Sequence, residues 1–393
     1  MGKKKTSIKI KHHNYNLYAK KKHRGRQTLA VILTVAAAAV LCVVGYSAGK
    51  PIMEYLTNRE QYTSDNSSVW TPPTTEDTAD AAESAAPSSE QAESAEPVEE
   101  YALEDTYILP EGAALNSGSL NSAIAAAKNS GYTGVAVTLK DADGYFLYRS
   151  SIEGIKDSED IKGALTAEQI CDIITKAELT PVARINTLMD HISPNSIEGI
   201  KFTSTEGWTW LDNYAENGGK TWLNPFNKET ADFMEKITEE LSAAGFKTIV
   251  LTNTKFPNFN PVDYSLLADI GDSSKRLTAL WQVVESAGKG AEKNGAEILP
   301  EMGAGIFEAE KLSTDAELSA DKEKLKNFTL LIDYSAENNS NVYIEAKTFT
   351  NKMKALYPGQ EYAVLIKGSG FSGNTFTEVK RAFEEAGIVI FSE

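Results

Sequence analysis

The sequence predicts an α/β protein whose folded part is a (β/α)8 barrel. Eight short apolar runs recur through the last ~290 of its 393 residues, and amphipathic segments separate them. Several of those segments end on a glycine shortly before the next run, which is typical of a helix returning to a strand. No G-x-G-x-x-G follows a first strand, as an open dinucleotide-binding sheet would require. The runs are 107–109, 134–140, 181–187, 248–253, 297–302, 328–334, 362–367 and 388–391.

The first 26 residues carry eight Lys and two Arg but no acidic residue. Residues 27–49 contain no charged residue. They include a long apolar run, 28–46, whose length suits a helix across a bilayer. A cleaved signal peptide is the alternative, although its apolar core is usually shorter. The basic tail predicts a cytoplasmic N-terminus, and a nucleic-acid patch is the weaker interpretation of the same lysines. We therefore expect a signal anchor at 27–49 that holds the protein in the lipid bilayer of the cell membrane.

Residues 50–105 predict an extended stalk. The segment is rich in Ser, Ala, Glu, Thr and Pro, and it is strongly acidic. Such a composition buries too little apolar surface to offset the entropy lost on ordering. The expected organisation is a cytoplasmic tail (1–26), an anchor (27–49), a disordered stalk (50–105) and an extracytoplasmic barrel (106–393).

The sequence of the barrel region predicts five amphipathic helices with recognisable ends. The second opens with Thr166 and Gln169 at capping-box spacing. The chain stops just after the eighth apolar run, so we expect the last outer helix to be absent or replaced. Cys171 falls on the apolar face of its helix and is expected in the core. The helices are 119–131, 166–179, 229–245, 274–295 and 374–387.

The charge balance and the histidine content exclude two classes of function. The formal net charge is −16, and an acidic barrel disfavours nucleic-acid binding, since phosphate contacts need a basic face. His191 is the only histidine after the N-terminal tail, which makes a histidine-based metal site improbable. We expect no metal and no cofactor.

Barrel enzymes take their catalytic residues from the C-terminal ends of the strands and the loops that follow. Strands five and six end in Glu301 and Asp333, while strand seven ends in Lys367 without an acid. The longest loop follows strand three and holds Trp208, Trp210 and Trp222. Aromatic faces there can stack on sugar rings, or the tryptophans can form a small core that folds the loop on itself.

Four blocks of the sequence resemble the bacterial putative glycosyl hydrolase domain family of (β/α)8 barrels, over about 107–257 and weakly afterwards. They are GYTGVAVTLKDADGYFLYRS (131–150), PVARINTLMD (181–190), TWLNPFNKETADFMEKITEELSAAGF (221–246) and KFP (255–257). The order and spacing of the blocks carry the resemblance. The matching positions are Lys140, Asp141, Arg184, Trp222, Pro225, Phe256 and Pro257.

The chain departs from the family at the exit of strand four. Thr252 and Asn253 stand where the family has Asp-Tyr, and Lys255 replaces its Arg. Glycoside hydrolysis ordinarily needs two carboxylates, and a threonine hydroxyl can serve as neither the acid nor the nucleophile. Glu301 and Asp333 are the remaining catalytic candidates. Each could instead be a strand-end acid that pairs with Lys140, Arg184 or Lys255.

The resemblance implies a glycoside-hydrolase-like barrel that acts on cell-envelope or extracellular glycan, with polysaccharide as its partner. The alternative is a catalytically inactive pseudoenzyme that binds glycan or serves as an envelope scaffold. Either way, the residues expected to bind substrate are Lys140, Asp141, Arg184, Trp208, Trp210, Trp222, Asn253 and Lys255.

Overall fold

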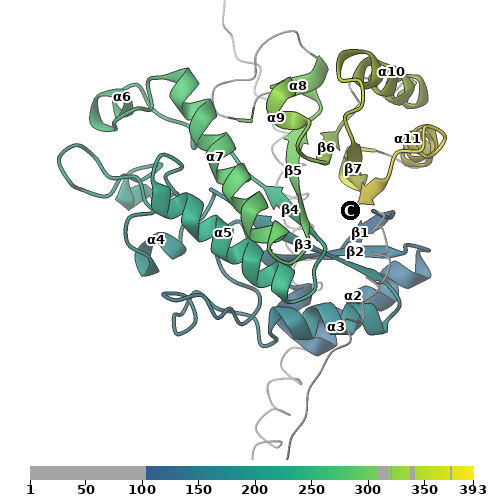
Figure 1. Ribbon diagram of the computed structural model, residues 1–393, viewed down its shortest axis with the longest axis horizontal. Helices are drawn as coiled ribbons and strands as arrows, with labels where there is room; N and C mark the ends of the chain where they lie inside the picture. Colours follow the sequence, from purple (N-terminus) through teal and green to yellow (C-terminus); the bar gives the residue numbers. More distant parts are fainter. Residues whose placement is uncertain (1–102, 309–316, 319–320, 337–340, 372–373) are drawn as a thin grey trace, which may run out of the picture. The chain divides into compact units, whose positions relative to one another are not determined.

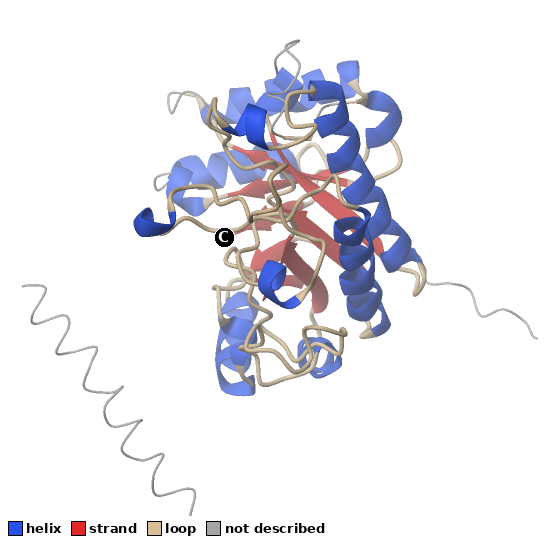
Figure 2. Cartoon of the chain, turned by 90° about the vertical axis from the view of Figure 1, so that its left-hand side faces the viewer, coloured by secondary structure: helices blue, strands red, loops and turns tan. Residues whose placement is uncertain are grey.

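The computed structural model describes residues 103–308, 317–318, 321–336, 341–371 and 374–393. They form a closed barrel of parallel strands, in which each strand pairs with the next along the chain and the eighth pairs with the first. Helices surround the strands (Figures 1 and 2). The predicted (β/α)8 fold is therefore confirmed.

All eight predicted strands are present, and their ends differ from the prediction by at most two residues. Short apolar runs bounded by glycine and polar residues are easily located, whereas terminal residues depend on individual hydrogen bonds. The strands are β1 (Thr106–Ile108), β2 (Gly134–Lys140), β3 (Thr180–Asn186), β4 (Thr248–Thr252), β5 (Glu297–Gly303), β6 (Leu330–Tyr334), β7 (Tyr362–Ile366) and β8 (Ile390–Ser392).

The five predicted helices are also present, and side-chain caps mark where α2, α3 and α7 start. At the start of α3 the Thr166 hydroxyl accepts from the Gln169 N–H at 3.2 Å, while the Gln169 side chain accepts from the Thr166 N–H at 3.0 Å. Cys171 lies on the buried face of α3, as predicted. The longer helices are α2 (Ser117–Asn129), α3 (Ala167–Lys176), α5 (Lys228–Ala243), α7 (Ser273–Glu292), α10 (Val342–Leu356) and α11 (Asn374–Glu384).

The sequence analysis missed α10, which follows β6. Its first turns contain β-branched and aromatic residues of low helix propensity. Tertiary packing overrides that propensity, because the buried residues recur with helical period. The Asn341 side chain, which accepts from the Ile344 N–H, caps its start and was the available sequence clue. The buried residues of α10 are Val342, Ala346, Phe349, Thr350 and Met353.

Short helices lie in the connections after β3, β4 and β5, where the loops are longest. They are α4 (Ser193–Ser196), α6 (Asp263–Leu266), α8 (Gly305–Glu308) and α9 (Lys322–Leu325). After β5 the described chain supplies only α8 and α9 (Figure 1).

Two apolar layers stabilise the barrel. One fills the space between strands and helices, and the other is a smaller cluster contributed by every strand. Since side chains alternate between the two faces of a strand, a residue two positions beyond a member of the small cluster faces the barrel lumen near its C-terminal mouth. The members of the small cluster are Ile108, Ala136, Val182, Val250, Leu299, Leu331, Ala363, Leu365 and Phe391.

The predicted cytoplasmic tail (1–26), membrane anchor (27–49) and nearly all of the stalk (50–105) lie outside the described residues. Within the described part of the chain, no helix is both long and apolar enough to cross a membrane.

Candidate functional site

A cleft of about 300 Å³ opens at the C-terminal ends of β4 to β7. Both predicted catalytic acids line it, and so do two of the predicted substrate-binding residues, Asn253 and Lys255. Two further residues complete its charged lining, Glu317 and Lys367. The cleft is therefore a mixed-charge depression at the end of the barrel where such folds keep their chemistry.

Glu301 and Asp333 approach the cleft from adjacent strands. The register pairs Asp333 with Gly303, so Glu301 lies two residues earlier on the neighbouring strand and faces the same way. Strand spacing and rise place their Cα atoms roughly 8 Å apart. The structure brings the two acids to one cleft, a point that the sequence analysis left open.

A cation from another strand holds each of these acids. The Arg184 guanidinium of β3 reaches across to Glu301, with Nη2 3.1 Å from Oε2, and the two side chains are 18% and 14% exposed. Lys367, just beyond β7, places its Nζ 2.6 Å from Oδ2 of Asp333, where both side chains are about one-third exposed. Arg184 was one of the partners expected for a strand-end acid, whereas Lys367 was not. These ion pairs fix the orientation of both carboxylates at the cleft wall.

The exit of strand four carries no acid into the cleft. Thr252 is buried, and its hydroxyl donates to the Ile185 carbonyl at 3.2 Å. Asn253 adopts a left-handed conformation, with φ of 52°, which asparagine tolerates better than most residues. Its side-chain amide donates to the Asn186 side-chain oxygen. Thr252 therefore joins β4 to β3, and Asn253 and Lys255 are the residues that this segment presents to the cleft.

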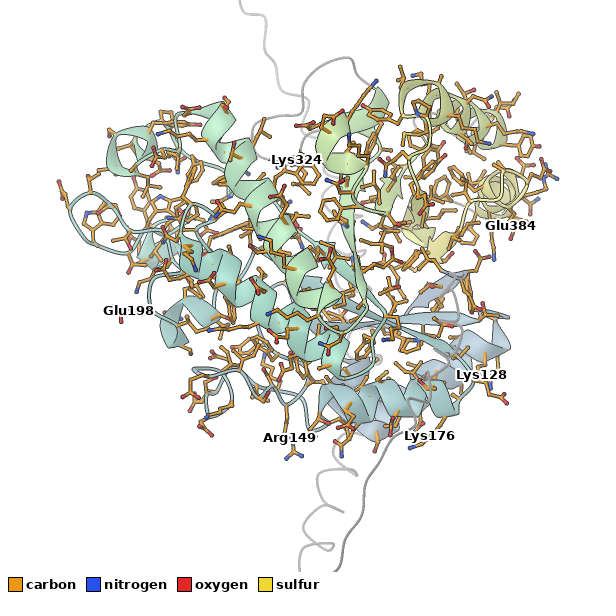
Figure 3. All side chains as sticks on the ribbon, in the orientation of Figure 1. Lys128, Arg149, Lys176, Glu198, Lys324 and Glu384 are labelled. Carbon is orange, nitrogen blue, oxygen red and sulfur yellow. The ribbon has the colours of Figure 1, made fainter. Side chains whose placement is uncertain are left out.

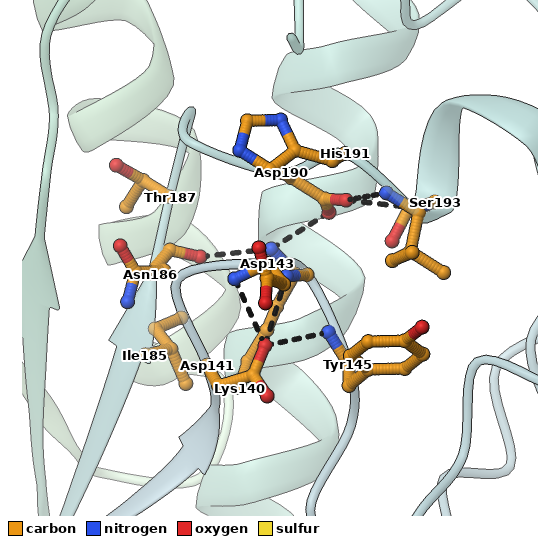
Figure 4. A network of polar contacts seen from close by, with 12 residues as sticks. Lys140, Asp141, Asp143, Tyr145, Ile185, Asn186, Thr187, Asp190, His191 and Ser193 are labelled. Carbon is orange, nitrogen blue, oxygen red and sulfur yellow. Dashed lines mark hydrogen bonds and ion pairs between the residues drawn. The ribbon is translucent and has the colours of Figure 1, made fainter. Parts of the chain in front are cut away.

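Lys140 lies apart from the cleft, in a fully buried ion pair within the network that joins the loops after β2 and β3 (Figure 4). Its ammonium lies 2.7 Å from Asp190 Oδ2 and donates to the Asn186 carbonyl at 3.0 Å, and neither charged side chain is exposed. Gly144, at φ +105°, makes room for the network, because a Cβ there would lie 2.0 Å from Asp190 Oδ1. The predicted contact of Lys140 with substrate is not supported, since its ammonium is enclosed by protein oxygens.

Asp141 organises the turn after β2. Its Oδ1 accepts backbone hydrogen bonds from Asp143, Gly144 and Tyr145 at 2.9–3.0 Å. The sequence analysis assigned Asp141 to substrate. The structure shows a different use of this carboxylate, because one oxygen is occupied by the turn it closes.

A second, more open hollow of about 460 Å³ lies beside that turn and includes His191, Asp143 and Lys220. The Lys220 ammonium, 2.7 Å from the Asp143 carboxylate, holds the pKa of Asp143 below its ordinary value, and Asp143 in turn raises the pKa of Lys220. His191 donates from Nδ1 to the Thr221 carbonyl at 2.6 Å and packs edge-on against Trp222. His191 is therefore a loop residue, as expected.

The three loop tryptophans separate into two buried residues and an exposed one. Trp210 is 2% exposed, and its indole N–H donates to Asp263 at 3.0 Å. Trp222 is 8% exposed and donates to Asp212 at 3.0 Å. Trp208 is 43% exposed. The structure thus shows the small loop core that was one of the two expectations, and Trp208 is the tryptophan whose face remains accessible to a sugar.

The sequence analysis missed the contribution of Glu317 to the cleft and gave Lys367 no role. Glu317 lies in the long connection between β5 and β6, where no hydrophobic period marks its position. Lys367 directly follows an apolar strand, so the sequence predicts its position at the barrel mouth. The sequence does not predict its ion pair with Asp333.

Larger hollows exist at the opposite end of the barrel, including one of about 830 Å³ near Tyr362 and Val389. Size does not make them better candidates, because the strands direct catalytic side chains to the C-terminal mouth. Within the described ranges, from 103 onward with their gaps, no cluster of three or more His, Cys, Asp or Glu residues could hold a metal ion.

These features define a closed parallel barrel with a charged cleft at the C-terminal ends of its strands. Residues 107–334 match the family described as "Putative glycosyl hydrolase domain", and the chain belongs to this family. The match continues past the point where the resemblance weakened in the sequence analysis. No curated protein matches the sequence.

Among the similar solved structures, one supports the barrel fold. The PgaB (BpsB) glycoside hydrolase domain from Bordetella bronchiseptica is 12% identical, with a TM-score of 0.50, and the alignment covers 74% of this chain and 94% of that one. A hypothetical protein from Ruminiclostridium thermocellum is 21% identical with a TM-score of 0.40, covering 51% of this chain and 96% of that one. A GH20 exo-β-N-acetylglucosaminidase from Vibrio harveyi is 13% identical with a TM-score of 0.42, covering 67% and 41%. At these identities the similarity concerns the barrel alone.

Proposed function

We propose that this barrel binds and hydrolyses a polysaccharide of the cell envelope or the extracellular space at the cleft that Glu301 and Asp333 line. The observation that supports this proposal is the meeting of the two carboxylates at one open cleft. Most glycoside hydrolases act through a pair of carboxylates that flank the scissile bond. Arg184 and Lys367 hold the two carboxylates in place, which is the kind of preorganisation that such chemistry needs.

The proposal includes where the reaction takes place. The uncharged run at 27–49 and the basic tail before it suit a single-pass anchor with a cytoplasmic N-terminus. The acidic stalk (50–105) would then hold the barrel away from the membrane surface, on the extracytoplasmic side. Protease digestion of intact cells that carry an epitope after Glu393 tests this arrangement, since the epitope should be removed.

A second candidate is a barrel that binds glycan without hydrolysing it. One observation favours it: Thr252, where the family resemblance implies an acid, is buried and bonded to the neighbouring strand. In this alternative the ion-paired acids Glu301 and Asp333 accept hydrogen bonds from sugar hydroxyls.

One experiment separates the candidates. The protein, its Glu301→Gln variant and its Asp333→Asn variant are incubated with peptidoglycan, chitin, cellulose and xylan. New reducing ends and binding to each polymer are measured. Hydrolysis by the native protein that both variants lose by at least about 10³-fold supports the enzyme. Retention on a polymer without cleavage supports the binding protein. If the native protein neither binds nor cleaves any of the four polymers, both candidates are rejected.

A further inference from the structure

Glu317 reaches the cleft from a part of the chain far from the other acids. It lies in the connection between β5 and β6, and its backbone forms an antiparallel bridge with Lys255 at the exit of strand four. The next residue, Leu318, is only 2% exposed and belongs to the main core. The bridge and the buried leucine therefore hold Glu317 beside the exit of strand four, where Thr252 and Asn253 supply no acid.

The side chain of Glu317 shares the cleft with Glu301, Asp333 and Lys255. Directly opposed residues in an antiparallel pair place their Cβ atoms ~4.5–5.5 Å apart on one face. Lys255 and Glu317 thus stand on the same side of their short ribbon, and both line the cleft.

Glu317 differs from the other two acids in its partners. Glu301 is held by Arg184 at 3.1 Å and Asp333 by Lys367 at 2.6 Å, whereas Glu317 is exposed and has no ion pair with any other residue that the structure describes. The two ion pairs hold the Glu301 and Asp333 carboxylates at the cleft wall, where either can accept a proton from an attacking water. No cation holds the Glu317 carboxyl among the residues that the structure describes, so it can turn toward a leaving oxygen, which a general acid must reach.

We propose that Glu317 is the proton donor of the hydrolysis proposed above, in place of the strand-four acid. The inference rests on that proposed function. The Glu317 carboxyl gives its proton to the glycosidic oxygen as the bond from this oxygen to the anomeric carbon breaks. A water molecule forms the new bond to that carbon and releases a proton to the carboxylate of Glu301 or Asp333. Solvent returns this proton to Glu317, so one glycosidic bond and one water become two hydroxyl groups.

A proton donor has a distinctive kinetic effect, because a good leaving group departs without a proton. The test compares the full-length protein with Glu317→Gln on two substrates. One is whichever of the four polysaccharides the native protein cleaves, and the other is the 2,4-dinitrophenyl glycoside of the same sugar. Glu317→Gln should lose about 10²–10⁴-fold in kcat/KM on the polysaccharide and under about 10-fold on the dinitrophenyl glycoside. The high-pH limb of its rate profile should also disappear.

Two further variants control for structure. Glu317→Asp keeps the carboxyl group and should retain more activity than Glu317→Gln. Glu198→Gln changes an exposed carboxylate at the periphery of the barrel (Figure 3) and should behave as the native protein.

Three outcomes would overturn the inference. If Glu317→Gln stays within about threefold of the native rate while Glu301→Gln and Asp333→Asn are inactive, only the role of Glu317 falls. If Glu317→Gln loses both substrates equally, the residue acts on structure and not on proton transfer. If the native protein cleaves no polysaccharide, the hydrolase function and the donor role fall together.

Discussion

Removing the ammonium of Lys140 should destabilise the barrel strongly, because it leaves Asp190 charged in a fully buried place. The native pair is 2.7 Å apart with neither side chain exposed. Lys140→Met keeps most of the side-chain volume but removes the cation. Among the described residues, the Asp190 carboxylate would then keep two backbone donors, the N–H groups of Ile192 and Ser193 on Oδ1. Breaking a buried ion pair from one side costs about 3–5 kcal/mol.

For a domain of this size, about 2 °C of melting temperature corresponds to each kcal/mol, so we expect Lys140→Met to melt about 6–10 °C lower. Thermal unfolding followed by circular dichroism measures the shift. Lys326→Met is a matched control, since its ion pair with Glu323 is largely exposed and such pairs contribute at most about 1 kcal/mol.

The double variant Lys140→Met with Asp190→Asn tests the cause. Asparagine keeps an oxygen for the same backbone donors without a buried charge, so the double variant should recover part of the lost stability. A Lys140→Met shift below about 2 °C, or a double variant whose loss is the sum of the single losses, would refute the reasoning.

Three other predictions follow from the loops and from strand four. Lys220→Met should raise the pKa of Asp143 toward its ordinary value of 3.8 in an NMR titration, and an unchanged pKa would contradict the assignment. Because the pKa of Asp143 is lowered in the native protein, the ion pair stabilises the fold at pH values above 3.8. That stabilisation is lost as the pH falls through the lowered pKa. Trp208→Ala should weaken polysaccharide binding about tenfold with little change in melting temperature, because Trp208 is exposed. Trp210→Ala should instead cost about 3–5 kcal/mol of stability, because it leaves a cavity in the loop core. Equal effects of the two variants on binding and on stability would contradict the different roles assigned to the two tryptophans. Thr252→Val should cost about 1 kcal/mol and keep full activity, and a loss of activity with an intact fold would show that Thr252 takes part in the reaction.

The site was predictable where it depended on strand ends. Glu301 and Asp333 each terminate an apolar run, so the barrel topology places both at the mouth. The pairing of Glu301 with Arg184 was one of the expected arrangements. The helix α10 was missed because its propensity is poor and its packing face becomes clear only against the strands.

Residues on irregular segments could not be assigned from the sequence. Glu317 reaches the cleft through a backbone bridge to Lys255, between positions 62 residues apart. Trp208 and Trp210 look equivalent in the sequence, and the fold of their loop alone buries one and exposes the other. Lys140 and Lys255 likewise look like similar cations, yet only Lys255 lines the cleft.

The sequence by itself determined the (β/α)8 barrel, its eight strands, the family and the two strand-end acids, because the alternation of apolar runs and amphipathic segments is a local pattern with a small set of three-dimensional solutions. It also predicts the anchor and the stalk, from composition alone. Only the tertiary structure decided which charges face solvent, which pair, and which acid stands beside Thr252. Those outcomes depend on contacts between distant segments, and the burial of a single side chain can reverse its role.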